Sequence, residues 1–235
     1  MKVDRIFFTS NKIEDFFSLN EEESKHCIKV LRLKLGDEIV INDGKGNFYF
    51  TEIISDNAKK CTVQIKSKQE VEKSTAVNIH IAIAPTKNID RFEWFLEKTT
   101  EIGIDEITPI LCERSERKDI KIERVEKIVI SAMKQSLKAH LPKLNSLTSF
   151  SILVKTPFDG EKYIAHCNNA SENLVEIYKK GTNAIILIGP EGDFSEKEIK
   201  LAKENNFKEI SLGKSRLRTE TAGVVACDMI NILNY

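Results

Sequence analysis

Residues 184–188 read Ala-Ile-Ile-Leu-Ile and lead directly into Gly189-Pro190-Glu191-Gly192-Asp193-Phe194. A short apolar run that ends at glycine and proline is typical of a buried strand followed by a turn. Ser195 and Glu198 then form a capping-box pattern, which predicts that a helix begins there. Another apolar run at 210–212 predicts the next strand. The stretch therefore predicts a strand, a loop, a helix and a second strand in succession.

The same alternation of strands and helices extends outward from this stretch over most of the chain. Further strands are predicted at 77–84, 107–111 and 163–166, and helices at 89–102, from 122 to about 138, and at 222–233. Alternation of this kind predicts an α/β fold with a mainly parallel sheet and helices on both of its faces.

The first seventy residues have a different pattern, in which short strands predominate. Asp43-Gly44-Lys45-Gly46 separates two apolar runs and predicts a hairpin. Asn20 followed by Glu23 predicts the start of one helix. These elements predict a small β-barrel or sandwich. Residues 66–74 are polar and lack periodicity, so a linker is predicted there between domains at 1–70 and 75–235.

The composition is that of an ordinary globular protein, with 235 residues, 41% of them hydrophobic, and 36 basic residues balanced by 36 acidic ones. Apolar runs are far shorter than the roughly 18 residues of a membrane helix, and the charged start Met-Lys-Val-Asp-Arg is unlike a signal peptide. A cytoplasmic protein that does not span a membrane is therefore predicted. The 4 histidines and 5 cysteines are dispersed, so we expect no metal site and no disulfide framework.

Two loops at predicted strand ends are candidates for ligand binding, because ligands of open α/β sheets bind beyond the carboxyl ends of the strands. The loop at 189–194 combines glycines, which let a ligand approach the backbone, with a proline that restricts the loop. It lacks the GxGxxG and Walker patterns, which disfavours a dinucleotide or a triphosphate. The second loop places Arg218 beside Glu220 before a helix. An ordinary turn and a surface ion pair with a helix cap are the structural alternatives.

Basic residues predominate between Arg114 and Lys143, and no acidic residue occurs from Lys127 onward in this stretch. A concentrated positive face of this kind suits a phosphate backbone. The alternative is a solvated helix surface.

Several segments, taken together and in order, resemble the RsmE family of SPOUT-class methyltransferases. The segments are Glu97-Lys-Thr-Thr-Glu-Ile-Gly103, Glu113-Arg-Ser115, Ala132-Met-Lys-Gln-Ser136, Ile188-Gly-Pro-Glu-Gly-Asp-Phe194 and Leu212-Gly-Lys-Ser-Arg-Leu-Arg-Thr-Glu-Thr-Ala222. Arg5-Ile-Phe-Phe8 and His26-Cys-Ile-Lys-Val-Leu-Arg32, followed by Gly36-Asp37, resemble the family's N-terminal PUA-like RNA-binding domain. The resemblance spans almost the whole chain.

The resemblance implies an enzyme that uses S-adenosylmethionine to methylate N3 of a uridine in 16S ribosomal RNA of the small ribosomal subunit. It also implies a C-terminal SPOUT domain with a trefoil knot, a PUA-like barrel and a homodimer. The chain departs from the family's usual residues at some positions. Glycine is usual where Asp193 stands, arginine and isoleucine where Ser215 and Arg216 stand, and glycine and arginine are common at Leu137 and Lys138.

The matched motifs also supply candidate site residues. The expected cofactor-binding residues are Ile188, Gly189, Pro190, Glu191, Gly192, Leu212, Gly213 and Leu217. The expected RNA-binding residues are Arg5, Arg32, Lys87, Arg114, Lys134 and Lys138. Uridine N3 carries a proton in neutral water, so its methylation requires a group that removes the proton or stabilises the uracil anion. Arg218, Glu220 and Glu101 are the candidates for these roles.

Two other functions remain open at this point. A SPOUT methyltransferase that modifies a ribose 2′-hydroxyl would share the fold and the cofactor. An assembly factor that binds ribosomal RNA without transferring methyl groups is the second alternative, which the departures at Asp193 and Ser215 favour.

Overall fold

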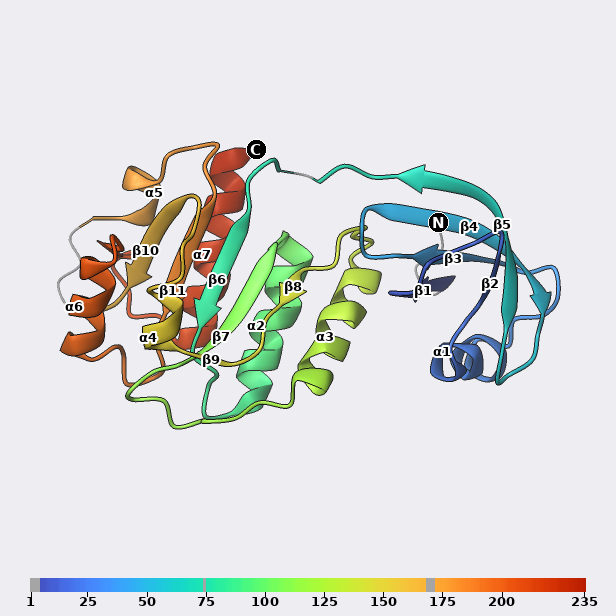
Figure 1. Ribbon diagram of the computed structural model, residues 1–235, viewed down its shortest axis with the longest axis horizontal. Helices are drawn as coiled ribbons and strands as arrows, with labels where there is room; N and C mark the ends of the chain where they lie inside the picture. Colours follow the sequence, from blue (N-terminus) through green and yellow to red (C-terminus); the bar gives the residue numbers. More distant parts are fainter. Residues whose placement is uncertain (1–4, 74, 168–171) are drawn as a thin grey trace. The chain divides into compact units, whose positions relative to one another are not determined.

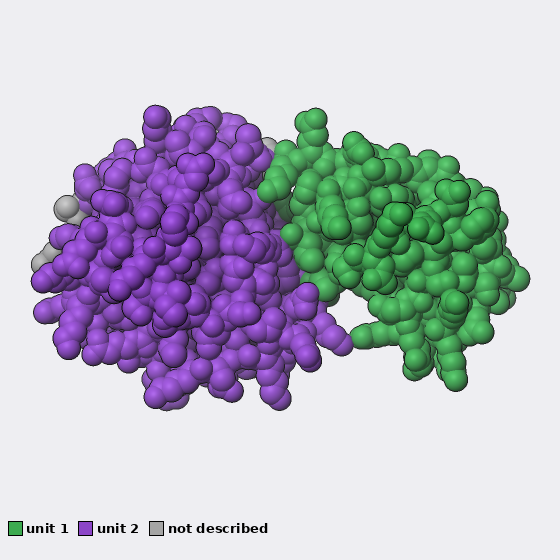
Figure 2. All heavy atoms as spheres, in the orientation of Figure 1, with its two compact units in different colours: residues 1–73, 130–141 green, residues 74–129, 142–235 purple. Residues whose placement is uncertain are grey.

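The structure of the chain is a computed structural model that describes residues 5–73, 75–167 and 172–235. The chain folds into two compact units (Figures 1 and 2). The first unit consists of Met1–Lys73 together with Ile130–Leu141, and the second of Ser74–Val129 together with Pro142–Tyr235. Within the described ranges, no helix is long and apolar enough to cross a membrane.

The first unit contains a five-stranded sheet in the order β1-β3-β4-β5-β2. Strand β1 runs parallel to β3, and the other neighbours are antiparallel. The strands are β1 Ile6–Phe8, β2 Phe16–Ser18, β3 Glu38–Asn42, β4 Asn47–Ser55 and β5 Thr62–Glu70. The predicted β-rich domain and its hairpin are confirmed.

The linker predicted at 66–74 is wrong for its first part, because β5 continues to Glu70. Residues 67–70 pair with Asn47–Phe50 of β4 in the same ladder. Their side chains are exposed on both faces of the strand, so the alternation that normally identifies a strand is lacking. Residue 74 lies outside the described residues.

The predicted helix of the first unit begins at Asn20, whose side chain accepts a hydrogen bond from the backbone N–H of Glu23 over 2.8 Å. Helix α1 spans Glu21–Lys25 and continues into a π-helical turn at His26–Val30. Cys27 in this turn is buried among apolar side chains of the sheet, including Phe7 and Ile41. The helix therefore covers one face of the sheet.

The segment at 130–141 covers the other face, which explains why it groups with the first unit. Ala139 is buried against Ile6, Val40 and Phe48. Its carbonyl accepts a hydrogen bond from the N–H of Gly46, in the hairpin turn, over 3.0 Å. Residues distant in the sequence thus complete the core of the first unit.

The second unit contains a seven-stranded sheet in the order β12-β10-β11-β6-β7-β8, with β9 also paired to β7. All described pairings in this sheet are parallel. The strands are β6 Ile79–Ile83, β7 Glu106–Leu111, β8 Lys143–Leu144, β9 Thr148–Ser149, β10 Glu161–Ala165, β11 Ala184–Ile188 and β12 Lys208–Ile210. The helices are α2 Ile89–Ile102, α3 Ile122–Gln135, α4 Phe150–Leu153, α5 Leu174–Ile177, α6 Glu196–Glu204 and α7 Thr219–Asn234, and the part of α3 from Ile130 onward belongs to the first unit.

Helices cover both faces of this sheet, as predicted (Figure 1). On one face, Phe150 of α4 and Ile199 of α6 belong to the same buried cluster as Leu187 of β11. On the other face, Gly223 of α7 lies directly against Phe95 of α2 and Ile83 of β6. The last strand ends two residues before its predicted end at 212, so the following loop begins at Ser211.

Candidate active site

The first candidate loop, Gly189–Phe194, leaves the carboxyl end of β11. Gly189 and Pro190 are buried, whereas Glu191 and Gly192 are exposed. A Cβ atom on Gly189 would lie 3.2 Å from the ring of Phe194, which is itself buried and packs against Phe150. The loop therefore folds back so that Phe194 packs against Gly189, and its middle residues Glu191 and Gly192 are exposed.

Asp193 occupies the left-handed region of the backbone, with φ of 62°. Most residues disfavour this region, but glycine, asparagine and aspartate tolerate it. The Asp193 carboxylate accepts hydrogen bonds from the backbone N–H groups of Cys167, over 2.9 Å, and Phe194, over 2.8 Å. The departure from the family's usual glycine is therefore compatible with an ordered loop.

Lys87 and Arg114, both predicted to bind RNA, contact this first loop. The backbone N–H of Lys87 donates to Glu191 Oε1 over 2.9 Å. The guanidinium of Arg114 donates to the carbonyl of Gly192 over 2.9 Å. The loops that follow β6, β7 and β11 are thereby joined at the carboxyl edge of the sheet.

The second candidate loop, residues 211–218, begins at the same edge of the sheet. It starts after β12 and leads to α7, whose Gly223 lies beside Ile83 of β6. Because β12, β10 and β11 are parallel, the carboxyl ends of β12 and β11 lie at one edge. Gly213 in this loop has φ of 120°, and the space beside its α-carbon is open. The two loops predicted to bind the cofactor therefore leave the same edge of the sheet.

Glu220 is buried at the start of α7, with 6% of its surface exposed. Its Oε1 atom lies 3.9 Å from Nε of Arg91 on α2. Its Oε2 atom has no hydrogen-bond partner among the described residues. Arg218 is exposed two residues earlier, at the N-cap position of the helix. The structure thus brings Arg218 and Glu220 to the same end of α7, and Arg91 joins them.

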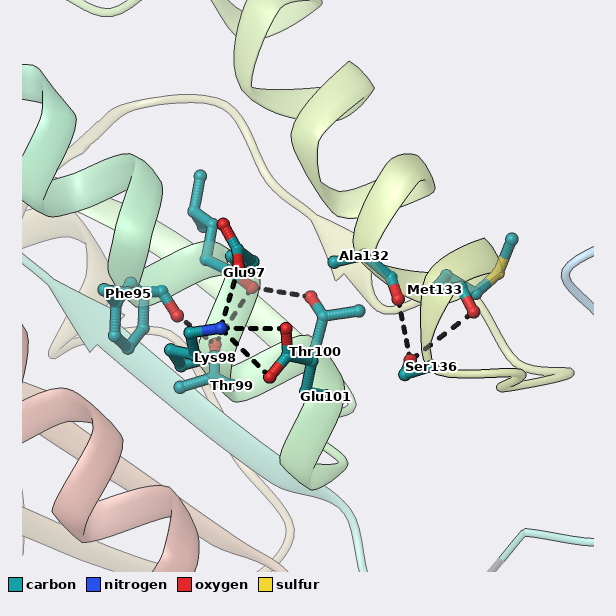
Figure 3. A network of polar contacts seen from close by, with 10 residues as sticks. Phe95, Glu97, Lys98, Thr99, Thr100, Glu101, Ala132, Met133 and Ser136 are labelled. Atoms are coloured by element: carbon teal, nitrogen blue, oxygen red, sulfur yellow. Dashed lines mark hydrogen bonds and ion pairs between the residues drawn. The ribbon is translucent and has the colours of Figure 1, made fainter. Parts of the chain in front are cut away.

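Glu101, the third predicted catalytic residue, lies at the other end of α2. It forms an ion pair with Lys98 over 3.0 Å (Figure 3), and the pKa of Lys98 is raised by its contacts with Glu97 and Glu101. Ten residues of helix separate Glu101 from Arg91, a distance of about 15 Å. Within one chain, the structure therefore does not bring Glu101 to Glu220.

The remaining predicted RNA-binding residues belong to the first unit. Arg5 donates to the carbonyl of Glu38 over 3.2 Å. Arg32 is exposed, whereas Lys134 is half-buried and forms an ion pair with Glu23 over 3.0 Å. The backbone carbonyl of Lys138 accepts a hydrogen bond from Asn42 over 2.8 Å. Of these four residues, Arg32 is the most exposed to solvent.

The sequence prediction missed two arginines of the site. Arg91 lies in the first turn of α2, and Arg117 donates to the carbonyls of Thr86 and Lys87 over 3.0 and 2.8 Å. Both arginines follow predicted strands, and this position at a strand end could have identified them as candidate site residues. The order of the strands was needed to show which loops they contact.

Comparison with known proteins identifies the family. Residues 72–231 match the model of an RNA methyltransferase domain, and residues 19–66 match that of an RNA methyltransferase PUA domain. The chain is 31% identical to the ribosomal RNA small subunit methyltransferase E of Mesomycoplasma hyopneumoniae over 223 residues, which cover 93% of this chain and 95% of that protein. The chain belongs to the ribosomal RNA small subunit methyltransferase E family.

Solved structures of similar proteins support this placement. A probable rRNA methyltransferase from Porphyromonas gingivalis is 41% identical, with 98% of each chain covered and a TM-score of 0.90. The ribosomal RNA small subunit methyltransferase E of Neisseria gonorrhoeae, which was solved with bound S-adenosyl methionine, is 26% identical, with 98% of each chain covered and a TM-score of 0.88. The predicted fold class, a PUA-like domain joined to a SPOUT methyltransferase domain, is confirmed.

Proposed function

We propose that this chain methylates N3 of a uridine in 16S ribosomal RNA of the small ribosomal subunit, with S-adenosylmethionine as the methyl donor. The observation that carries the proposal is membership of the methyltransferase E family over the whole chain, together with a relative of the same fold that binds S-adenosyl methionine. The domain at residues 1–70 serves as the RNA-binding domain and the domain at 75–235 as the methyltransferase domain, whose segment at 130–141 belongs to the first compact unit.

The cofactor binds against the two loops at the carboxyl edge of the parallel sheet. The open space beside Gly213 and the outward-facing middle of the first loop fit a small molecule held against the backbone. When bound, S-adenosylmethionine supplies a methyl group that is already activated by its sulfonium charge. The residues that hold it are Ile188, Gly189, Pro190, Glu191, Gly192, Leu212, Gly213 and Leu217.

For methyl transfer, residues of this chain must remove the proton from uridine N3 and stabilise the uracil anion. The free Oε2 atom of Glu220 accepts this proton, and Arg91 holds the carboxylate from its other oxygen. Arg218 donates to a uracil oxygen and stabilises the negative charge that develops on the ring. Glu101 is the weaker candidate, because it lies about 15 Å from Arg91 along α2.

The RNA is held by basic residues of both domains, which are Arg5, Arg32, Lys87, Lys134 and Lys138. Single-stranded or looped RNA is the suitable form, because N3 is hidden within a base pair. The enzyme is a homodimer that acts in the cytoplasm, as the family resemblance implies. Analytical ultracentrifugation of the full chain tests the dimer.

The test of the function uses small-subunit RNA from a strain that lacks this gene. Purified protein and S-adenosylmethionine should restore 3-methyluridine in a nucleoside digest analysed by mass spectrometry. A 2′-O-methylated nucleoside would identify the ribose methyltransferase instead. Failure of the protein to bind S-adenosylmethionine at millimolar concentration in a calorimetric titration would support the assembly factor.

A further inference from the structure

The turn that follows β7, residues 112–117, carries two arginines that bind neighbouring loops; we name it the arginine turn. Arg114 donates from Nη1 to the carbonyls of Gly192, over 2.9 Å, and Phe194, over 3.4 Å. Arg117 donates to the carbonyls of Thr86 and Lys87. One short turn thus holds the loop after β11 and the loop after β6.

Gly192 has no side chain, which leaves room for Arg114 to pack against it. A Cβ atom at Gly192 would lie 3.3 Å from Cβ and 3.5 Å from Cδ of Arg114, so the aliphatic part of the arginine lies directly over the glycine. Both carbonyls accept hydrogen bonds from the same nitrogen, Nη1, and the positive charge of the guanidinium strengthens these bonds. The contact therefore combines packing of the arginine stem over Gly192 with two charge-assisted hydrogen bonds.

The arginine turn is itself anchored by a buried carboxylate. Glu198 Oε1 accepts the backbone N–H of Glu113 over 2.8 Å, and its Oε2 accepts the backbone N–H of Ser195 over 2.9 Å. Ser115 closes the turn through its hydroxyl, which accepts the N–H of Cys112 over 3.0 Å. Glu198 thus joins the turn to the N-terminus of α6, immediately after the first loop. A rigid support of this kind is what a preorganised binding loop requires.

From these contacts we propose that Arg114 and Arg117 are positioning residues, which fix the loops after β11 and β6 in the shape that binds S-adenosylmethionine. This inference rests on the proposed function and assigns Arg114 a role other than contact with RNA. The guanidinium of Arg114 is committed to two carbonyls of the cofactor loop, and loss of a charge-assisted hydrogen bond of this type weakens an interaction about tenfold or more.

The experiment compares Arg114→Ala, Arg114→Lys and the control Lys118→Ala in the full chain. Lys118 is an exposed cation in the same basic stretch. Calorimetric titration should show S-adenosylmethionine binding at least tenfold weaker in Arg114→Ala, partly recovered in Arg114→Lys, and within twofold of wild type in Lys118→Ala. In steady-state assays, the KM for S-adenosylmethionine should rise, while kcat at saturating cofactor stays within about twofold of wild type.

Other outcomes would overturn the inference in distinguishable ways. Unchanged cofactor affinity with weaker, less salt-dependent RNA binding would make Arg114 an RNA contact. Unchanged affinity with a lower melting temperature would make its role purely structural. If Arg114→Ala does not fold, Arg114→Lys and Arg117→Ala, which removes the hydrogen bonds to the carbonyls of Thr86 and Lys87, give the same comparison. Wild-type protein that fails to bind S-adenosylmethionine would refute the proposed function itself.

Discussion

Arg218 lies at the N-cap position of α7, yet in the described chain its side chain makes no capping hydrogen bond. The helix is therefore not expected to depend on this side chain. If Arg218 stabilises the uracil anion, Arg218→Ala should reduce the single-turnover rate by roughly 100-fold, with cofactor affinity and melting temperature nearly unchanged. Rates and thermal unfolding measured on one preparation decide the matter, since a full rate with lowered stability would remove Arg218 from the catalytic group.

His80 allows a prediction about pH, because it is a buried residue of β6 whose ring forms a hydrogen bond with the hydroxyl of Thr108 on β7. Burial, opposed in part by Glu106, lowers the pKa of His80 from 6.5 to about 4. A folded-state pKa below the unfolded one contributes stability at pH above 6.5, and that stability is lost as pH falls from 6.5 to about 4. The difference corresponds to ~3 kcal/mol. Chemical denaturation of wild type and His80→Gln should show a steeper loss of stability in the wild type over this range; parallel curves would contradict it.

At the scale of elements, glycine substitutions can test the contact between the hairpin turn and the segment at 130–141. This contact joins residues from two parts of the chain in the first unit. Gly46 has φ of 96°, and a Cβ there would lie 2.6 Å from Cε1 of His140. Gly36 has a similar φ of 83°, but the space around its α-carbon is open. Gly36→Ala should therefore cost only the backbone strain, about 1 kcal/mol. Gly46→Ala should cost clearly more, because His140 must also move.

Denaturant unfolding of these two variants measures the difference. Equal losses of stability would mean that His140 yields freely and that the 130–141 segment is not held closely by the turn. Cofactor affinity of both variants serves as a control, since neither glycine belongs to the methyltransferase domain.

Local sequence patterns correctly predicted the helices that begin or end at a residue typical of a helix terminus. Helix α2 matches its predicted range because Gly103, with φ of 127°, ends it, and α6 begins at the capping box of Ser195 and Glu198. Strand β2 was missed, since it has 3 residues and pairs with the distant β5. In the site, both loops were predicted, but the contact of Arg91 with Glu220 depends on the order of the strands, which no local pattern contains. The trefoil knot stays a prediction.

At the scale of the whole molecule, the balanced net charge means that RNA binding depends on local basic residues rather than on overall attraction. The six predicted RNA-binding residues differ in how free they are to act. Arg32 is exposed, whereas Lys134 is already paired with Glu23, and both side chains of that pair are largely covered, with 22% and 15% exposed. A lysine that already has a carboxylate partner releases fewer counterions from RNA than a free arginine does.

This difference gives a prediction that concerns both domains together. Arg32→Ala should weaken RNA binding and reduce the slope of log affinity against log salt by about one unit, because one phosphate contact is lost. Lys134→Ala should change the slope by less, and should lower the melting temperature, because Glu23 loses its partner. Neither variant should change the affinity for S-adenosylmethionine, because Arg32 and Lys134 belong to the first unit and both cofactor loops belong to the second. Salt titrations of RNA binding with wild type and both variants measure these slopes. An unchanged slope in Arg32→Ala would mean that Arg32 does not contact the RNA. RNA binding would then depend on the basic residues of the methyltransferase domain.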